Sequence, residues 1–407
     1  MTKEIQPTKK TLSQSSVFSY DAYQSFGVHP TRDKKGYLFR VFAPNADSVS
    51  VCGDFNSWDP RIHPMQKIGE SGVWELVLEK ELPKSCKYKY FLRRGGTGSF
   101  KADPFAFCAE KNPNGASVTE SLEEYAWRDS GWLSYREKYF GGKKKAEQPI
   151  CIYRVDPLWW RRHGNGSLYH FRELADELIP YAKQMGYTHI ELIGITGGFS
   201  KSRSIPDALF APSPSLGNPR ELMSFIDSAH EAGIGVILAW NPFSFEASEH
   251  GLSDFDGTPL FESVGEKGNV RFFDLERNEI KKFLMANALF WVKKYHADGL
   301  SIDPSLSRQG REEAFLRALQ ARMRAEAPDI IITTGKKPNI KSSVMGCEFG
   351  DTWTVGCERT LAWQLLDQHM HAEQQLSVAR ENHSHLSAPP GAKGGGAAKS
   401  HTGINKD

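Results

Sequence analysis

The spacing of apolar residues changes near Pro149, and this change limits the folds open to the chain of 407 residues. Between about Tyr20 and Ala126, short segments alternate apolar with polar residues and are separated by turns rich in Gly, Asn and Asp. Four of these segments are GYLFRVFAP, SVSVCGDF, GVWELVLE and CKYKYFL. Short, regularly spaced strands of this kind predict an immunoglobulin-like β-sandwich at residues 20–126.

After Pro149, strand-like and helix-like segments alternate. The predicted strands are CIYRV, THIELIG, VILAW, DGLSID and DIIITT. The helical patterns that alternate with them cover residues 171–185, 219–232, 278–296 and 308–326. This alternation predicts a parallel sheet, either doubly wound or a (β/α) barrel of the TIM type. No G-x-G-x-x-G motif follows the first strand, which weakens the dinucleotide-binding version of the doubly wound fold.

These patterns divide the chain into five parts. We expect a disordered arm at 1–19, the β-sandwich at 20–126, a linker at 127–149, a partial barrel at 150–380 and a disordered tail at 381–407. The tail, PPGAKGGGAAKSHTGINKD at its end, is too rich in Gly, Ala and Lys to bury a core. A closed eight-stranded barrel commonly needs about 250 residues. We therefore expect an incomplete barrel.

Composition excludes several classes of function. The net charge of +2 gives no electrostatic basis for binding nucleic acid or a membrane surface. The polar N-terminal stretch MTKEIQPTKKTLSQSS lacks the apolar core of a signal peptide, so we expect a cytoplasmic protein. The six cysteines form no C-x-x-C pair and the histidines form no H-E-x-x-H motif, so we expect neither a metal nor a cofactor.

The stretch YHADGLSIDP carries the strongest candidate for chemistry. It passes through a turn and then runs as a short apolar strand into Asp303. A carboxylate at the C-terminal end of a parallel strand lies where barrel enzymes place their catalytic groups.

Several segments resemble a known family of enzymes. GDFNSWDP, YKYFL and FKADPFAF occur in this order in the predicted sandwich and resemble a family-48 carbohydrate-binding module. IYRVDPLWWRRHGNG, HEAGIGVILAWNPFSF and NALFWVKKYHADGLSIDPS resemble the barrel of bacterial 1,4-α-glucan (glycogen) branching enzymes, which belong to glycoside hydrolase family 13. The resemblance covers about residues 20–365. It implies a protein of glycogen metabolism that acts on α-glucans, transferring chains from α-1,4 to α-1,6 linkages.

The resemblance also implies a glucan-binding site in the module. Its three residues here are Trp58, Lys89 and Phe100. Flat rings can cover the apolar face of a glucose unit, and a lysine can donate hydrogen bonds to its hydroxyl groups. The alternative for Trp58 is packing against a strand edge or against the barrel.

In the resembled barrel, Asp303 stands at the position of the nucleophile. Retaining transfer needs a second carboxyl group about 5–5.5 Å away, which acts as acid and base. The family places this acid at the end of the fifth strand, where this chain has Gly335, or Thr334 if the register shifts by one residue. Neither residue can donate a proton as a general acid.

Other matched positions depart from the family in the same direction. Ser301 replaces an arginine that precedes the nucleophile by two residues. In the third-strand motif, Ala239 and Ser244 replace an aspartate and a sugar-binding histidine. We therefore predict a catalytically inactive, α-glucan-binding pseudoenzyme in which Asp303 marks the ancestry.

Three alternatives stay open. The chain is an active branching enzyme, an interaction subunit that associates with itself or with another glycogen enzyme, or a decayed gene product. A carboxylate of Asp298, Glu348 or Asp351 close to Asp303 would favour the active enzyme. Trp159 and Trp160 are expected to pack between the two domains, and the alternative is that they line a groove.

Overall fold

The computed structural model describes residues 17–111, 115–140, 150–197, 208–265, 268–302 and 312–334. Asp303, Gly335, Glu348 and Asp351 lie outside these ranges, and so do the predicted tail and most of the predicted arm. Thr334 belongs to the last described strand, but only its backbone is described.

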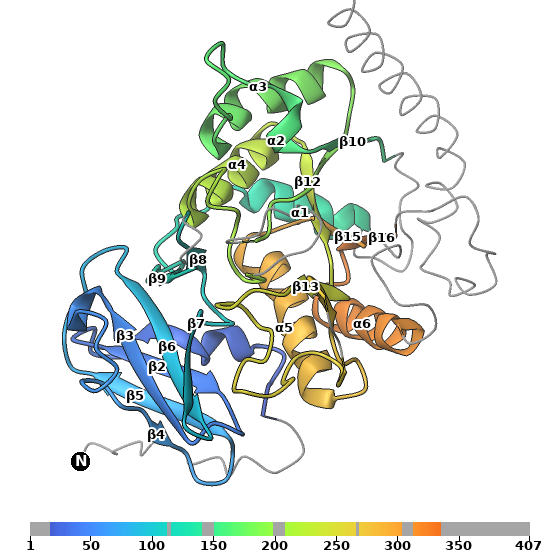
Figure 1. The fold of residues 1–407 in the computed structure, drawn as a ribbon. Helices are drawn as coiled ribbons and strands as arrows, with labels where there is room; N and C mark the ends of the chain where they lie inside the picture. The colour runs from blue at the N-terminus through green and yellow to red at the C-terminus, as the bar shows by residue number, and fades with distance from the viewer. Residues whose placement is uncertain are drawn as a thin grey trace, which may run out of the picture. The chain divides into compact units, whose positions relative to one another are not determined.

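The N-terminal part forms two antiparallel sheets, which confirms the predicted β-sandwich (Figure 1). The first sheet has the order β1 (Gly27–Pro30), β2 (Tyr37–Phe42), β5 (Val73–Leu78), β4 (Gln66–Lys67). The second has the order β3 (Ser48–Gly53), β6 (Lys87–Arg94), β9 (Ser117–Val118), β8 (Cys108–Ala109), and β7 (Thr97–Lys101) pairs with β6. Two short 3-10 helices, η1 (Ala22–Gln24) and η2 (Asp54–Asn56), flank these strands.

Alternation along β6 explains the core of the sandwich. Tyr88, Tyr90 and Leu92 are buried at every second position, since successive side chains of a strand point to opposite faces. The hydroxyl groups of Tyr88 and Tyr90 donate to the buried Asp103 carboxylate at 2.7 and 3.2 Å. The polar ends of these tyrosines are therefore satisfied inside the core.

The second part is built on five parallel strands. Their order is β10 (Ile152–Val155), β11 (His189–Leu192), β12 (Gly235–Trp240), β15 (Gly299–Ile302), β16 (Ile331–Thr334). Each strand pairs with the next one of the set along the chain, without the reversal of order that defines a doubly wound sheet. The described residues thus form five of the eight strands of a (β/α) barrel.

The described helices between β10 and β16 agree with the predicted ranges, except for the short helix α2, which was not predicted. They are α2 (Pro157–Trp160), α3 (Phe171–Gln184), α4 (Pro219–Glu231), α5 (Asn278–Lys294) and α6 (Glu312–Glu326). Local capping explains why the start of α4 could be predicted from the sequence. The Asn218 side chain accepts from the Glu221 amide at 3.0 Å, and Pro219 follows in the first turn.

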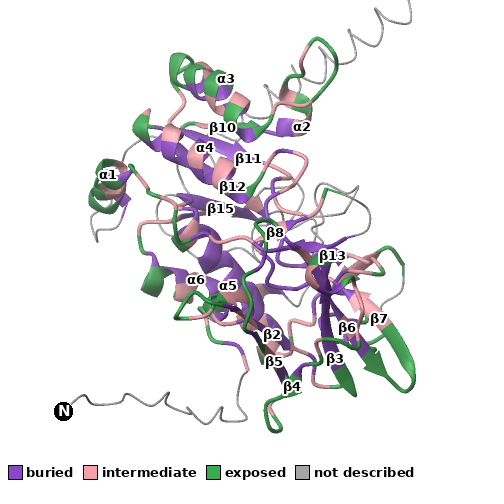
Figure 2. Cartoon of the chain, turned by 90° about the vertical axis from the view of Figure 1, so that its left-hand side faces the viewer, coloured by how far each residue is buried: buried purple, intermediate pink, exposed green. Residues whose placement is uncertain are grey.

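The two faces of the parallel sheet differ. Leu192, Leu238 and Leu300 are aligned in register, fully or almost fully buried, and share their face with Trp240, which donates to Asn287 of α5 at 2.7 Å. This face therefore packs against the helices, and Figure 2 shows the central strands in the colour of buried residues. The opposite face holds the other alternating positions, including the ion pair between Arg154 and Glu191 at 3.1 Å.

Two stretches contain structure that the sequence patterns did not indicate. Residues 127–149, expected as a linker, include helix α1 (Ser130–Phe140). The segment between β12 and α5 contains a hairpin of β13 (Ser244–Glu246) and β14 (Val270–Phe272). Helix α1 depends on tertiary contacts, because Arg136 pairs with Asp329 at 2.7 Å and with Asp298 at 3.0 Å.

Apolar and polar contacts join the sandwich to the second part. The ring of Phe105 lies 4.9 Å from that of Phe210 and 5.1 Å from that of Phe283. The buried Lys101 ammonium donates to the carbonyl oxygen of Ser253 at 2.7 Å. The buried Asp256 carboxylate accepts from the Asn45 backbone amide at 2.9 Å.

Candidate functional site

In (β/α) barrels, the catalytic groups lie at the C-terminal ends of the parallel strands. Ala239 and Ser301 are register partners on neighbouring strands, on the face that carries Glu191. Ser301 is 8% exposed, so a small hydroxyl group occupies the position at which the resemblance implies an arginine. No charged side chain stands at this pair of positions to align a carboxylate on the following residues.

The turn after β12 uses its polar groups internally. The Asn241 side-chain amide donates to the Ser244 hydroxyl at 3.0 Å, and the Asn241 carbonyl oxygen accepts from the Phe243 amide at 3.0 Å. Ser244 and Phe243 are both buried. The position at which the resemblance implies a sugar-binding histidine therefore serves to close a turn.

Asp298 is excluded as the second carboxyl group of a catalytic pair. It precedes Gly299 and lies at the N-terminal end of β15, whereas the expected site lies at the C-terminal end. A four-residue strand separates its two ends by roughly 10–13 Å, more than the about 5–5.5 Å that a retaining pair requires. Glu348 and Asp351 lie outside the described residues.

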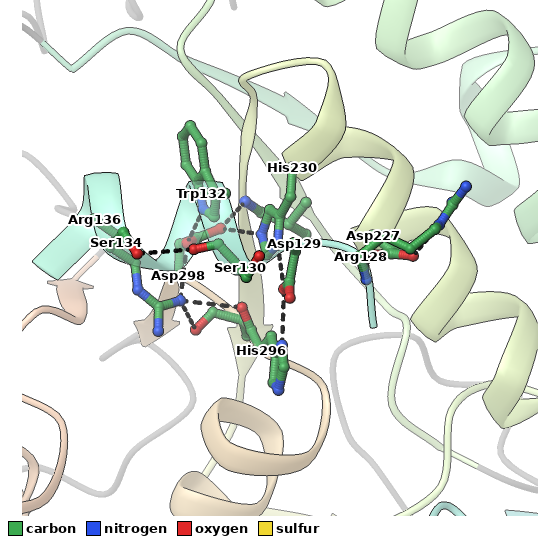
Figure 3. A network of polar contacts seen from close by, with 12 residues as sticks. Arg128, Asp129, Ser130, Trp132, Ser134, Arg136, Asp227, His230, His296 and Asp298 are labelled. Carbon is green, nitrogen blue, oxygen red and sulfur yellow. Dashed lines mark hydrogen bonds and ion pairs between the residues drawn. The ribbon is translucent and has the colours of Figure 1, made fainter. Parts of the chain in front are cut away.

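Instead, Asp298 is the centre of a buried polar network (Figure 3). One carboxylate oxygen accepts from the Trp132 indole at 2.7 Å and from Arg136 at 3.0 Å. The other accepts from the Val236 backbone amide at 2.6 Å and lies 2.9 Å from His230 Nε2. Burial opposes ionisation of Asp298, but His230 and Arg136 outweigh it and lower the pKa of the carboxyl group.

The network continues on the other side of His230. Its Nδ1 lies 2.9 Å from Asp129 Oδ2, which is also 2.7 Å from His296 Nδ1. Burial lowers the pKa of His230, but Asp298 and Asp129 outweigh it and raise that pKa. Nearby, burial lowers the pKa of His189 to about 4. Because these charges are mutually paired at the N-terminal end of the sheet, the network serves stability rather than chemistry.

Trp58 lies on the loop that follows β3. Its φ of 61° and the φ of 54° at Ser57 are in the left-handed region, which is uncommon for a bulky residue. The Trp58 indole donates to Asp54 Oδ1 at 3.2 Å, so the ring is held in one orientation while it stays partly exposed. Such local strain is typical of positions held for a reason other than stability.

Lys89 and Phe100 lie on one face of the neighbouring strands. Phe91 is two residues from Lys89 on β6 and pairs with Phe100 on β7, which gives the three residues a common face. The rings of Phe91 and Phe100 are 4.8 Å apart and partly exposed. Lys89 is only 6% exposed, and burial lowers its pKa against the attraction of Glu110 and Glu249.

The sequence prediction named Trp58, Lys89 and Phe100 as glucan-binding residues but did not include Phe91. The alternation in YKYFL was the available signal, because it places Phe91 on the same side as Lys89. The prediction that Trp159 packs between the domains is wrong, since this residue is 64% exposed. Trp160 is partly buried and donates to the Tyr153 hydroxyl at 3.1 Å, within the second domain.

Comparisons with known proteins agree with this architecture. Residues 25–106 match carbohydrate-binding module 48 (isoamylase N-terminal domain). The 1,4-alpha-glucan branching enzyme GlgB of Rhodospirillum rubrum is 44% identical over 296 residues, which cover 70% of this chain and 39% of that protein. The enzyme of the same name from Burkholderia thailandensis is 38% identical over 386 residues, covering 85% of this chain and 46% of that protein.

Solved structures show the same fold at low identity. The catalytic module of the pneumococcal glycogen-degrading virulence factor SpuA matches with a TM-score of 0.61 and 16% identity, covering 79% of this chain and 54% of that one. Apo pullulanase from Paenibacillus barengoltzii matches with a TM-score of 0.61 and 18% identity, covering 78% of this chain and 54% of that one.

The fold and these matches define the class: a carbohydrate-binding module 48 followed by an α-amylase-like (β/α) domain. Within this class, the chain is similar to the 1,4-alpha-glucan branching enzymes, at 44% and 38% identity to the two relatives above. It spans about half or less of the length of these two relatives, 39% and 46%. Among the described residues, no helix is long and apolar enough to cross a membrane.

Proposed function

We propose that this protein binds α-glucan through its module and does not catalyse branching. The observation that carries the binding proposal is the orientation of Trp58, a partly exposed ring held by Asp54 on a strained loop. Phe91 and Phe100 add apolar surface on the strands beside this loop. Flat rings of this kind suit the apolar faces of glucose units.

Lys89 has a narrower role in this proposal. Lys89 has low exposure, and its pKa is lowered. Its ammonium group therefore reaches a bound sugar only from below the rings of Phe91 and Phe100. A hydrogen bond from such a partly desolvated group to a hydroxyl is stronger than one made in bulk water. We therefore expect Lys89 to contribute to orientation, and the aromatic rings to contribute most of the affinity.

The absence of branching is the second half of the proposal. It is supported by Ala239 and Ser301, which put no charge at the ends of their paired strands, and by Ser244, which is used inside a turn. Loss of general acid–base catalysis by itself typically costs about 10²–10⁴-fold in rate. Together with the missing arginine, this leaves Asp303 without the groups that retaining transfer needs.

Active branching is the second candidate function. The 44% identity to a branching enzyme over 70% of the chain favours it. In this case a carboxyl group outside the described residues acts as the acid, and Asp303 is the nucleophile.

Retention on amylopectin or glycogen tests the binding proposal. Trp58→Ala should lower retention of the full chain about threefold to tenfold, since it removes one stacking ring. Ile62→Ala is the matched control, because Ile62 is a 53% exposed apolar residue of the same module. The proposal fails if the wild type is not retained, or if Trp58→Ala is retained as well as the wild type.

A branching assay separates the two candidate functions. The proposal predicts no new α-1,6 linkages in amylose and an unchanged iodine stain. New linkages that disappear in Asp303→Asn would establish the active enzyme instead. Linkages that persist in Asp303→Asn would show activity but exclude Asp303 as the nucleophile.

Association and location complete the proposal. Among the described residues, β10 and β16 each pair with a single neighbour in the parallel sheet, and exposed strand edges favour association. We propose self-association or association with another glycogen enzyme, and a mass measured by light scattering tests the first. We also propose a cytoplasmic location, which cell fractionation tests.

A further inference from the structure

A cavity of about 430 Å³ lies at the N-terminal ends of two parallel strands. Helix α1, the start of β11 and the end of α4 supply its walls, and the turn from α4 toward β12 closes one side. Its volume is within the range of about 300–1,000 Å³ that small-molecule sites commonly have. The cavity is separate from the module and from the end of the sheet at which barrel enzymes perform catalysis.

Aromatic side chains of α1 form one wall of the cavity, namely those of Trp132, Tyr135 and Phe140. The ring centres of Trp132 and Tyr135 are 5.3 Å apart. Trp132 is also stacked on His230, at 5.4 Å and 17° between the ring planes, as Figure 3 shows. Its indole N–H donates to Asp298 at 2.7 Å. This wall is therefore apolar and held in place by the buried network.

His189 adds a hydrogen-bond acceptor. It lines the cavity and is only 3% exposed. The Thr188 hydroxyl donates its single proton to the Cys151 carbonyl oxygen at 3.0 Å, so His189 Nδ1 is the donor in its 2.9 Å contact with that hydroxyl. Burial lowers the pKa of His189 to about 4, which leaves the ring neutral near pH 7 and Nε2 without a proton. Nε2 has no hydrogen-bond partner among the residues that the structure describes.

The position of the His189 ring depends on a glycine of the neighbouring strand. A Cβ atom at Gly235 would lie 2.3 Å from His189 Cδ2, 2.6 Å from His189 Nε2 and 3.1 Å from Trp132 Cζ2. Side chains do not approach this closely, so only glycine admits both rings here. The acceptor and the aromatic wall are thus placed together by the backbone of β12.

The buried polar groups of the cavity select a ligand that donates a hydrogen bond. The protons of the Trp132 indole and the Thr188 hydroxyl are already donated within the protein, and His189 Nε2 remains as an acceptor. A sugar fits poorly, because each of its hydroxyl groups needs a partner once it is taken out of water. A flat heteroaromatic ring with one N–H matches an aromatic wall and a single acceptor.

The charges around the cavity favour a neutral ligand. Among the described lining residues there is no lysine or arginine. The Glu231 carboxylate, which also lines the cavity, lies 3.0 Å from Arg128 and so has a counter-charge. A phosphate or carboxylate on a ligand would therefore lose water without gaining an unpaired cation.

From these observations we propose that this cavity binds a neutral, flat nitrogen heteroaromatic molecule whose N–H donates to His189 Nε2. The inference does not depend on the proposed α-glucan function. Because the ligand would contact both α1 and the sheet, its binding would also stabilise the fold.

Ligand-observed NMR of the full chain with benzimidazole, which has fused flat rings and one N–H, tests the proposal. We expect saturable binding with a dissociation constant of about 1 mM or lower. N-methylbenzimidazole cannot donate to His189 and should bind about threefold to tenfold more weakly. Benzimidazole carboxylate is the anionic comparison and should bind no more tightly than benzimidazole.

Two glycine variants locate the binding. Gly131 lines the cavity, and a Cβ atom there meets nothing within 4 Å, so Gly131→Phe should narrow the cavity without a clash and weaken binding about fivefold or more. Gly164→Phe is the matched control, because a Cβ atom at Gly164 is equally unobstructed and this residue does not line the cavity. His189→Phe keeps a flat ring but removes Nε2, and should abolish the preference for benzimidazole over its N-methyl analogue.

Four results would overturn the inference. They are no saturable binding of benzimidazole, equal binding by Gly131→Phe and Gly164→Phe, equal affinity for benzimidazole and N-methylbenzimidazole, and tighter binding of the carboxylate. The glycine pair decides the location even if His189→Phe does not fold. None of these results bears on retention by amylopectin, so the α-glucan proposal stands or falls separately.

Discussion

The two ends of strand β15 carry opposite chemistry. At its N-terminal end, the buried Asp298 carboxylate accepts hydrogen bonds from Trp132, Arg136 and a backbone amide, and it lies beside His230. Near its C-terminal end stands Ser301, paired in register with Ala239. Among the described residues, charge is concentrated at Asp298, where it joins helix α1 to the sheet, whereas Ser301 and Ala239 carry none near the C-terminal ends of their strands.

The groups near the N-terminal end of β15 stabilise the fold, whereas catalysis in barrel enzymes depends on groups at the C-terminal end. A buried carboxylate is tolerated only when it is paired and hydrogen-bonded, and Asp298 meets this condition with partners from three separate stretches of chain. Loss of one charged partner of Asp298 would leave a buried charge that is only partly compensated. Small substitutions at the C-terminal end leave no such charge behind, so that end can change while the fold is kept.

The largest expected effect follows from removing Asp298. Asp298→Ala should lower the free energy of unfolding by about 3–5 kcal/mol, because the buried Arg136 and His230 each lose one of their two carboxylate partners. Urea denaturation of the full chain, followed by fluorescence, measures this change. A loss below about 1 kcal/mol would show that the network does not hold α1 on the sheet.

Acid should lower the free energy of unfolding in two steps, through the buried groups at the N-terminal end of the parallel sheet. His189 has a pKa of about 4 in the folded protein against an ordinary value of 6.5, so the unfolded chain takes up the proton first as the pH falls. Stability should therefore fall between pH 6.5 and about 4, by up to about 3 kcal/mol. Below this range, Asp129 and Asp298 have lowered pKa values, and their contribution is lost as they become protonated.

The contribution of His230 to stability changes with pH in the opposite direction. Its raised pKa means that the folded protein holds this proton more tightly, so its contribution is complete below pH 6.5 and fades as the pH rises through the folded pKa. Denaturation midpoints measured from pH 4 to pH 8 should show a maximum near neutrality. His189→Gln should flatten the acid side of this curve, and an unchanged acid side would contradict the assignment.

The comparison also shows which features can be predicted from sequence. The parallel strands and helices α3 to α5 were found because apolar periodicity and caps such as Asn218 act locally. Helix α1 was not predicted because its stabilising contacts are not local. Trp132 and Arg136 bind Asp298 and Asp329, which lie about 160 to 190 positions further along the chain.

The candidate sites divide in the same way. The motif around Trp58 was recognisable, but its left-handed backbone and its bond to Asp54 are properties of the folded loop. Lys89 is 6% exposed, although lysines are rarely buried. The attraction of Glu110 and Glu249 for its ammonium group comes from segments that no local pattern connects to β6.

The smallest expected effect is at Ser301, at the other end of the strand from Asp298. Ser301→Ala removes one hydroxyl group and leaves no charge unpaired, so the free energy of unfolding should change by about 1 kcal/mol or less. The same urea titration that measures Asp298→Ala checks this value, and the two variants control for each other because Asp298 directly precedes β15 and Ser301 lies within it. Equal losses would mean that both ends of the strand are needed for stability, and would contradict a C-terminal end that tolerates substitution.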